Sequence, residues 1–378
     1  MNASSVGSSR SLTVVVAAGG AAWEAAALDE IRRSTRLQLH RRCLDVAELL
    51  ALSGLCDVAV VSTDMAGLDA DAVLTLQRDG VRVLGVGPEE RGHHLGISTT
   101  TVPGEIESHL REPEDVAASD ASGRLLAVWG PHGAPGRSVL AASVASAWAQ
   151  SGQQVTLVDA DPRGGAQAQM FAILDEVSGL VAACRSANHG DLAASSEHAV
   201  TIEPGLHLLT GVTRAAMWEQ VREGPFQIVL RTVIQASDAV VVDLGPGLDP
   251  QTHHVLGTAD QVLVVGRADP VGLARLVRAL HELASVRSVA LTPPVVVINH
   301  LRSTSVWSER DVRDAVERLT GVRPDVFVPA DFKTLDTAAL RGKVPAQIAS
   351  GSPFVAAVET LLDRLSPVGA GASQPAAR

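Results

Sequence analysis

The stretch Leu125–Ser138, LLAVWGPHGAPGRS, decides the fold of the larger part of the chain. It joins a short apolar run, a loop of glycine and proline, and a hydroxyl residue that opens a helical run. This order is typical of a phosphate-binding loop, because the free N–H groups and the dipole at the start of a helix attract an anion. Compared with GxxxxGK[ST], Gly136 and Ser138 are in place, whereas Pro131 replaces the first Gly and Arg137 replaces the Lys.

Composition limits the classes of protein to which the chain can belong. Its 378 residues suffice for two domains of ordinary size, and its formal net charge of -11 disfavours a general polyanion binder. The 3 cysteines are scattered without a CxxC motif, which indicates neither a disulfide framework nor a zinc site and fits a reducing cytoplasm. No signal peptide core and no run of about 20 apolar residues occurs. We therefore expect a soluble, cytoplasmic protein.

The first hundred residues alternate between apolar runs and helical stretches, which predicts a small doubly wound parallel sheet. The expected strands are 12–18, 37–43, 57–61, 81–86 and 99–102, and the expected helices are 21–33, 45–52, 70–78 and 105–111. This order resembles a response-regulator receiver domain.

The residues that carry receiver chemistry are nevertheless missing. The phosphoacceptor position falls on Ser62, with Asp64 two residues late, and the acidic pair after the first strand is replaced by Ala17 and Ala18. The Lys of the fifth strand is Val102. Without the carboxylates there is no metal site for phosphorylation, so the sequence predicts a pseudo-receiver that docks to other proteins.

The chain as a whole is predicted to be an α/β protein with two doubly wound parallel-sheet domains. A receiver-like (flavodoxin-like) domain precedes a P-loop NTPase domain, and the acidic stretch EPEDVAASDASG between them has the composition of a linker. The expected boundaries are 1–11 disordered, 12–112 pseudo-receiver, 113–123 linker, 124–366 P-loop domain and 367–378 disordered tail.

Carboxylates follow two apolar strands of the second domain. Asp159 and Asp161 close one strand and share a face of it, where they can hold Mg²⁺ through water or orient an attacking water. The DADP sequence is equally compatible with a simple strand cap before a turn. Asp243 closes a second run in the form of a Walker B strand, which would place it opposite the Ser138 hydroxyl. Any buried parallel strand that ends at Asp would look similar.

The order of the motifs is more specific than any one of them. Strand, Gly-rich loop, helix, DxDP, Walker B strand, VVVIN and VFVPAD follow one another as in the MinD/ParA group of P-loop ATPases, over roughly residues 124–365. With the pseudo-receiver in front, the chain resembles the CpaE/TadZ branch of that group, which includes the actinobacterial septum-site-determining (Ssd-like) proteins.

The resemblance implies ATP and Mg²⁺ as cofactors and gives roles to individual residues. The implied phosphate-binding residues are Gly133, Pro135, Gly136, Arg137, Ser138 and Val139. The implied metal ligands are Ser138, Asp159 and Asp243, the residue that orients the attacking water is Asp161, and the base contacts are Asn299, Pro329 and Asp331.

Three positions depart from the family loop KGGxGK[ST]: Ala134 replaces its second Gly, and both of its Lys residues are replaced. The first Lys, which in the family reaches the partner's nucleotide across a dimer, is His132, a poor substitute because it is shorter and mostly neutral at pH 7. The second is Arg137, which stays charged and can pair with phosphate in a bidentate way. Pro135 donates no N–H group, which weakens the phosphate nest. We therefore expect ATP binding with weak or slow hydrolysis.

The resemblance also implies partners. It predicts an ATP-sandwich homodimer that acts as a switch and positions septum or pilus/secretion machinery, with protein partners bound through the pseudo-receiver. Basic residues between 310 and 323 interleave with acidic ones, which disfavours nucleic acid. The tail is not amphipathic, so recruitment to the membrane at a pole or septum would be indirect. The competing prediction is a pseudo-ATPase scaffold that acts only through protein contacts, without nucleotide.

Overall fold

The computed structural model describes residues 11–111, 123–174, 177–191, 197–287, 292–301 and 307–365. The chain divides into two compact units. The first comprises Met1–Asp120, Cys184–Ser195 and Arg222–Val229, and the second comprises Ala121–Ala183, Ser196–Val221 and Leu230–Arg378. Apart from residues 11 and 123, the predicted disordered termini (1–11 and 367–378) and linker (113–123) lie outside the described residues.

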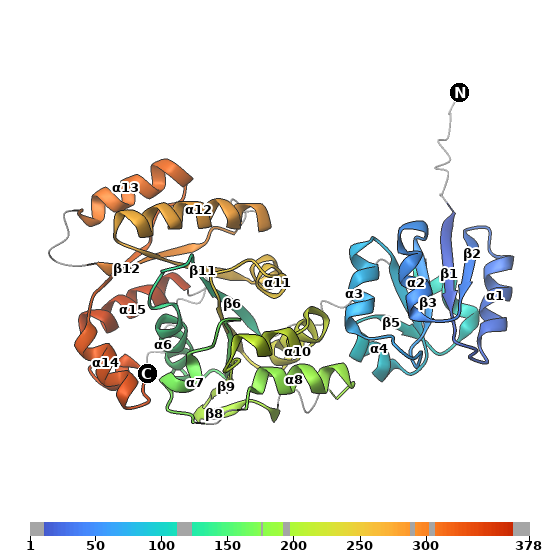
Figure 1. Ribbon diagram of the computed structural model, residues 1–378, viewed down its shortest axis with the longest axis horizontal. Coiled ribbons are helices and arrows are strands. Elements are labelled where there is room, and N and C mark those ends of the chain that lie inside the picture. The colour runs from blue at the N-terminus through green and yellow to red at the C-terminus, as the bar shows by residue number, and fades with distance from the viewer. Residues whose placement is uncertain are drawn as a thin grey trace, which may run out of the picture. The chain divides into compact units, whose positions relative to one another are not determined.

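Five parallel strands form the sheet of the first unit, in the order β2-β1-β3-β4-β5 (blue to cyan in Figure 1). They are β1 (Leu12–Ala17), β2 (Leu37–Cys43), β3 (Val58–Ser62), β4 (Arg82–Val86) and β5 (Ser98–Thr100). The helices along this stretch are α1 (Glu24–Arg33), α2 (Val46–Ala51), α3 (Ala70–Arg78), α4 (Glu89–Leu95) and α5 (Ile106–Arg111). This is the flavodoxin-like strand order, and it confirms the predicted α/β class.

The sheet of the first unit is covered by a hydrophobic core on each face, because side chains alternate along a strand. Val15 on β1 packs in one cluster with Leu76 of α3. Its neighbour Val14 packs in another cluster with Ile31 of α1 and Ile106 of α5. Helices on both faces make the unit doubly wound, as predicted.

Helix α4 was not expected from the sequence, because Pro88 and Gly92 look like turn residues. Its glycine is explained by packing: a Cβ on Gly92 would lie 2.2 Å from Cγ2 of Thr99. Pro88 stands at the N-cap, where its missing N–H group costs nothing. Close packing of a helix against a strand thus overrides the local turn signal.

Eight strands form the sheet of the second unit, in the order β13-β12-β11-β6-β10-β7-β9-β8. They are β6 (Arg124–Trp129), β7 (Val155–Ala160), β8 (Val200–Glu203), β9 (Leu206–Leu209), β10 (Ala239–Leu244), β11 (Gln261–Arg267), β12 (Val295–Leu301) and β13 (Val326–Pro329). Adjacent strands are parallel except β8 and β9, which are antiparallel. The predicted fold class is confirmed, and the sheet is mixed because a short antiparallel hairpin, which the sequence analysis did not include, forms this edge.

The described helices after residue 123 follow the predicted alternation. They are α6 (Arg137–Gln150), α7 (Gln167–Met170), α8 (Gly179–Asn188), α10 (Glu223–Ala236), α11 (Pro250–Thr258), α12 (Pro270–Val286), α13 (Glu309–Thr320), α14 (Phe332–Leu340) and α15 (Pro353–Leu365). No helix in the described part of the chain has the length and apolar character needed to cross a bilayer.

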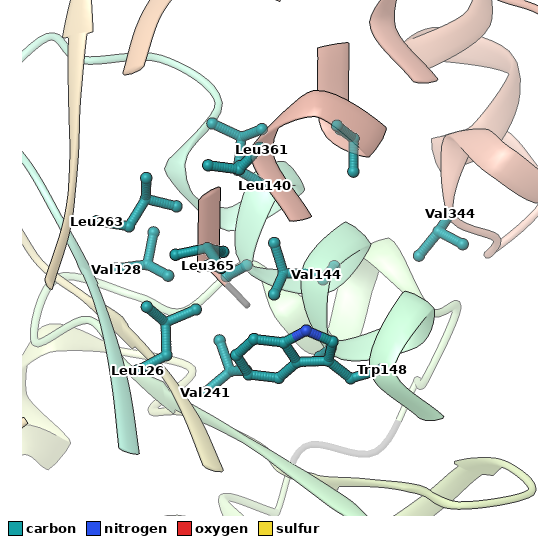
Figure 2. Packing of buried hydrophobic residues seen from close by; sticks show 14 of the residues in the cluster. Leu126, Val128, Leu140, Val144, Trp148, Val241, Leu263, Val344, Leu361 and Leu365 are labelled. Atoms are coloured by element: carbon teal, nitrogen blue, oxygen red, sulfur yellow. The ribbon is translucent and has the colours of Figure 1, made fainter. Parts of the chain in front are cut away.

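Helices α6 and α15 pack on one face of the larger sheet (Figure 2). Leu140 and Trp148 of α6 meet Val128 and Val241 from the sheet, and Leu361 of α15 closes the cluster. Burial of a large aliphatic or aromatic side chain contributes about 1.5–3 kcal/mol. This core fixes the direction of α6 and therefore the loop that precedes it.

Candidate nucleotide-binding site

The loop between β6 and α6 is shaped by glycines. Gly133 and Gly136 have φ angles of 74° and 87°, and Gly136 is the N-cap of α6. A Cβ on Gly130 would lie 2.3 Å from the carbonyl oxygen of Val265, so only glycine allows this close approach. The residues that follow, Arg137 and Ser138, begin the helix, whose first N–H groups are free to bind an anion.

Two carboxylates lie side by side at the ends of neighbouring strands. Asp159 on β7 is in register with Asp243 on β10, and each is 1% exposed. Burial raises the pKa of both carboxyl groups, and the charge of Asp243 raises the pKa of Asp159 further. The backbone N–H groups of Gln167 (3.0 Å) and Asp161 (3.4 Å) donate to Asp159 and offset part of this cost.

Asp243 is also connected to the phosphate-loop helix. The hydroxyl of Ser138 donates a hydrogen bond to it, and so does the side-chain amide of Gln167, at 2.8 Å. Both hydrogen bonds lower the pKa of Asp243 against the effect of burial. The structure therefore brings together the three predicted metal ligands, Ser138, Asp159 and Asp243, and adds Gln167, which the sequence analysis did not single out.

These oxygen groups fit Mg²⁺, which prefers hard oxygen ligands and keeps several of its waters. Two buried carboxylates with raised pKa values are an arrangement that a divalent cation would stabilise. Ser138 would be held beside Asp243, and Asp159 lies one strand away. Among the described residues no group of three or more His, Cys, Asp or Glu side chains could hold a metal by itself, so the remaining ligands would come from water or phosphate.

Arg137 is folded back onto its own loop. Its Nη1 donates to the carbonyl oxygens of Gly130 (3.0 Å) and Pro131 (3.2 Å), and its Nη2 lies 3.9 Å from Oδ2 of Asp161. Burial lowers the pKa of the guanidinium, and the charges of Asp243 and Asp161 counteract this. An arginine stays protonated in such surroundings, so the site contains a fixed positive charge next to the helix start.

Asp161 lies beyond the end of β7, in the turn that follows it. Its Oδ1 accepts a hydrogen bond from the backbone N–H of Arg163 at 2.9 Å. Its side chain keeps 21% of its surface exposed, in contrast to the buried Asp159. This exposure leaves a carboxylate oxygen available to orient a water.

Asn299, a predicted base contact, is tied to the phosphate loop. Its Nδ2 donates to the carbonyl oxygen of Pro135 at 2.8 Å, and its Oδ1 accepts from the backbone of His300. The side chain is 2% exposed, and a Cβ on Gly136 would lie 2.2 Å from Nδ2. Asn299 thus fixes the end of β12 against the loop.

The other two predicted base contacts come from the neighbouring strand. Pro329 is the last residue of β13 and pairs in register with Leu301. Asp331 is the N-cap of α14, where its Oδ1 accepts from the N–H of Thr334 at 3.3 Å and its Oδ2 is buried without a partner. The structure places both at the same edge of the sheet as Asn299.

A basic residue that no motif signals stands beside the loop. Nη1 of Arg275, an exposed residue of α12, donates to the carbonyl oxygen of His132 at 3.1 Å. A Cβ on Gly133 would lie 2.5 Å from the same atom. Arg275 belongs to a helix far along the sequence, so only the fold reveals that it adds positive charge here. The remaining predicted phosphate residue, Val139, is part of the first turn of α6.

The second unit matches known P-loop proteins. Residues 123–292 match the family model described as AAA domain. A ParA family ATPase from Chlorobium tepidum TLS aligns with a TM-score of 0.55 at 18% identity, over 63% of this chain and 98% of that one. MinD from Pyrococcus horikoshii OT3, described as complexed with Mg-ADP, gives 0.53 at 18% identity over 66% and 98%, and the cell division ATPase MinD from Pyrococcus furiosus gives 0.52 at 17% over 65% and 100%.

These similarities show the fold alone: the second unit has a P-loop NTPase fold like that of the MinD and ParA structures. No curated protein sequence matches the chain.

Proposed function

We propose that this P-loop domain binds ATP with Mg²⁺ and that the protein is a spatial regulator of the MinD/ParA type. One observation carries the proposal. Ser138, Asp159 and Asp243 come from three separate segments, yet they meet next to the free N-terminus of α6. A fold without a metal–phosphate ligand has no need to bury two carboxylates side by side.

In this proposal each residue of the site has a physical role. The backbone N–H groups at the start of α6 hold the phosphates, and the guanidinium of Arg137 leaves its carbonyl partners to pair with them. Mg²⁺ between Ser138 and the two buried carboxylates would neutralise phosphate charge. Asp161 orients water, and hydrolysis is slow because His132 and Pro135 weaken the loop. The adenine base binds at the edge of the sheet where Asn299, Pro329 and Asp331 lie.

The finer role follows the resemblance to the CpaE/TadZ branch. ATP would favour a sandwich homodimer, and the first unit, as a pseudo-receiver, would bind proteins of a septum or pilus/secretion machine and recruit the dimer to a pole or septum. One solved relative is described as a MinC:MinD cell division protein complex from Aquifex aeolicus, aligned at a TM-score of 0.50 and 18% identity over 68% of this chain. That precedent supports protein partners for this type of domain.

A scaffold without nucleotide remains the second candidate function. Arg137 and Asn299 are both hydrogen-bonded to carbonyl groups of the phosphate loop, so ligand binding has to break contacts that already exist. If these contacts outweigh those of the phosphates, the domain keeps the fold without a nucleotide cycle and acts through protein contacts alone.

Calorimetry of the purified full chain with ATP and Mg²⁺ distinguishes the two functions. We expect micromolar affinity, and a loss of about tenfold or more in Arg137→Ala, because a hydrogen bond to a charged group contributes about 1.5–3 kcal/mol. Asp243→Asn should abolish the dependence on Mg²⁺. Light scattering on the same samples should show dimers only with ATP.

Arg287→Ala is the matched control, because Arg287 also donates to two backbone carbonyls, those of Leu256 and Ala259, away from the phosphate loop. It should lower thermal stability and leave ATP affinity unchanged. Absence of binding at millimolar ATP would overturn the switch and favour the scaffold.

A further inference from the structure

Gln167 joins all three candidate metal ligands. It is the first residue of α7 and is 0% exposed. Its backbone N–H donates to Asp159 at 3.0 Å. Its side-chain Nε2 donates to Oδ2 of Asp243 at 2.8 Å and to the carbonyl oxygen of Ser138 at 3.0 Å. This one residue thus contacts α6, β7 and β10.

The other end of the Gln167 amide has no partner. Its Oε1 is buried and receives no hydrogen bond from the described residues. Most buried acceptors in proteins are paired, and an unpaired one costs free energy. Both oxygens of Asp159 already accept backbone N–H groups, and an ionised Asp243 can only accept hydrogen bonds, so neither carboxyl group satisfies Oε1. An orphaned acceptor next to two carboxylates indicates a missing donor.

We propose that Gln167 is a positioning residue for the Mg²⁺ that accompanies the nucleotide, and this inference rests on the proposed function. Its Nε2 holds Asp243 in the orientation that faces Ser138. Its Oε1 accepts a hydrogen bond from a water of the metal. Mg²⁺ keeps several waters in proteins, and each of them is a donor. Mutation of a group that orients metal ligands from outside the first coordination shell typically lowers metal affinity 10- to 100-fold.

A buried glutamine away from the candidate metal ligands serves as a control. Gln251 offers the comparison within the same unit: it is also buried, and its Nε2 donates to the carbonyl oxygen of Val221, far along the chain from the phosphate loop. Gln167 differs because its free oxygen lies among groups that attract a cation. The two glutamines therefore form a matched pair for mutation.

The test measures Mn²⁺ binding to the full chain by electron paramagnetic resonance, with and without ADP, and nucleotide affinity in EDTA by calorimetry. Gln167→Leu keeps the size of the side chain and removes both polar atoms. We expect it to weaken Mn²⁺ binding about 10- to 100-fold and to leave ADP affinity in EDTA unchanged. Gln251→Leu should leave Mn²⁺ binding unchanged.

Gln167→Met is the second variant, and it decides the question if Gln167→Leu fails to fold. Its flexible side chain fills the same space without a hydrogen-bond donor to Asp243, so it should also weaken Mn²⁺ binding, whereas a purely structural role predicts only a loss of thermal stability. Equal Mn²⁺ affinity in wild type and Gln167→Leu, an equal loss in Gln251→Leu, or absence of Mn²⁺ binding to the wild type under both conditions would overturn the inference. If Mn²⁺ binding depends on Gln167 but ATP does not bind, the proposed function fails while the inference about the metal site remains.

Discussion

At the scale of single residues, Asp159 and Asp243 are the two buried carboxylates of the candidate site. Burial raises the pKa of both carboxyl groups, and the charge of Asp243 raises the pKa of Asp159 further, so the pair destabilises the metal-free protein. The folded protein keeps a proton on Asp159 that the unfolded chain, with an ordinary carboxyl pKa of about 3.9, has already released. The free energy of unfolding therefore falls as the pH rises above about 4.

Asp159→Asn should raise the stability of the metal-free protein, because it removes the repelling charge and keeps an acceptor for the N–H of Gln167. We expect a gain of at least about 1 kcal/mol at pH 8 and a smaller gain at pH 5, measured by urea unfolding in EDTA. Asp260→Asn is the control, because Asp260 accepts from the N–H of Leu125 without a buried carboxylate beside it. A gain that does not depend on pH would contradict the assigned cause.

The sequence was sufficient to nominate Ser138, Asp159 and Asp243, because the carboxyl ends of parallel strands meet at one edge of a sheet. It was not sufficient for Gln167 or Arg275. The position of Gln167 depends on the turn between β7 and α7, and that of Arg275 depends on how α12 packs. Neither turn path nor helix packing has a signature in the local sequence.

At the scale of elements, one glycine at the junction of β6 and α6 also contacts a residue of β12. Gly136 combines a positive φ angle with the contact to Asn299, whereas Gly152, after α6, has a φ of 97° and no atom within 4 Å of an added Cβ. An alanine at Gly152 therefore tests backbone strain alone, whereas an alanine at Gly136 tests backbone strain together with loss of the contact to β12.

Gly136→Ala and Gly152→Ala should each destabilise the protein by about 1 kcal/mol through the left-handed backbone, as seen in thermal unfolding. Only Gly136→Ala should also reduce ATP affinity, because its methyl group displaces Asn299 from the carbonyl of Pro135. Equal ATP affinities in the two alanine variants would show that the Asn299 contact is irrelevant to binding.

Long elements were easier to predict than short ones. The apolar runs that form β6, β7 and β10 are buried on both faces, and strands of this kind are recognised in a sequence as nearly continuous hydrophobic runs. The hairpin of β8 and β9 has four residues in each strand, and β8 is partly exposed. Short edge strands lack both the length and the pattern that distinguish them from loops.

At the scale of the whole molecule, charge governs association. Two copies with a formal net charge of -11 each repel one another, and salt screens that repulsion. The basic residues of α13 and of the segment after it do not offset this charge as a separate face, because Arg310 lies 3.7 Å from Asp314 and Arg323 lies 3.9 Å from Glu317.

At saturating ATP and Mg²⁺, we therefore expect the dimer to tighten severalfold when NaCl rises from about 50 to about 300 mM, measured by sedimentation. Binding to DNA would weaken over the same range, because DNA contacts release counterions. A dimer that also weakens with salt would point to an interface held by complementary charges instead.

The strand order of the larger sheet has a consequence for how the protein is made. Strand β10 lies between β6 and β7, but the ribosome synthesises it after both. Until β10 emerges, β6 and β7 each present an open edge whose N–H and C=O groups invite pairing with other chains. Ser138 and Asp159 then lack Asp243, so a nascent chain cannot assemble the proposed metal site before β10 has emerged and inserted between β6 and β7.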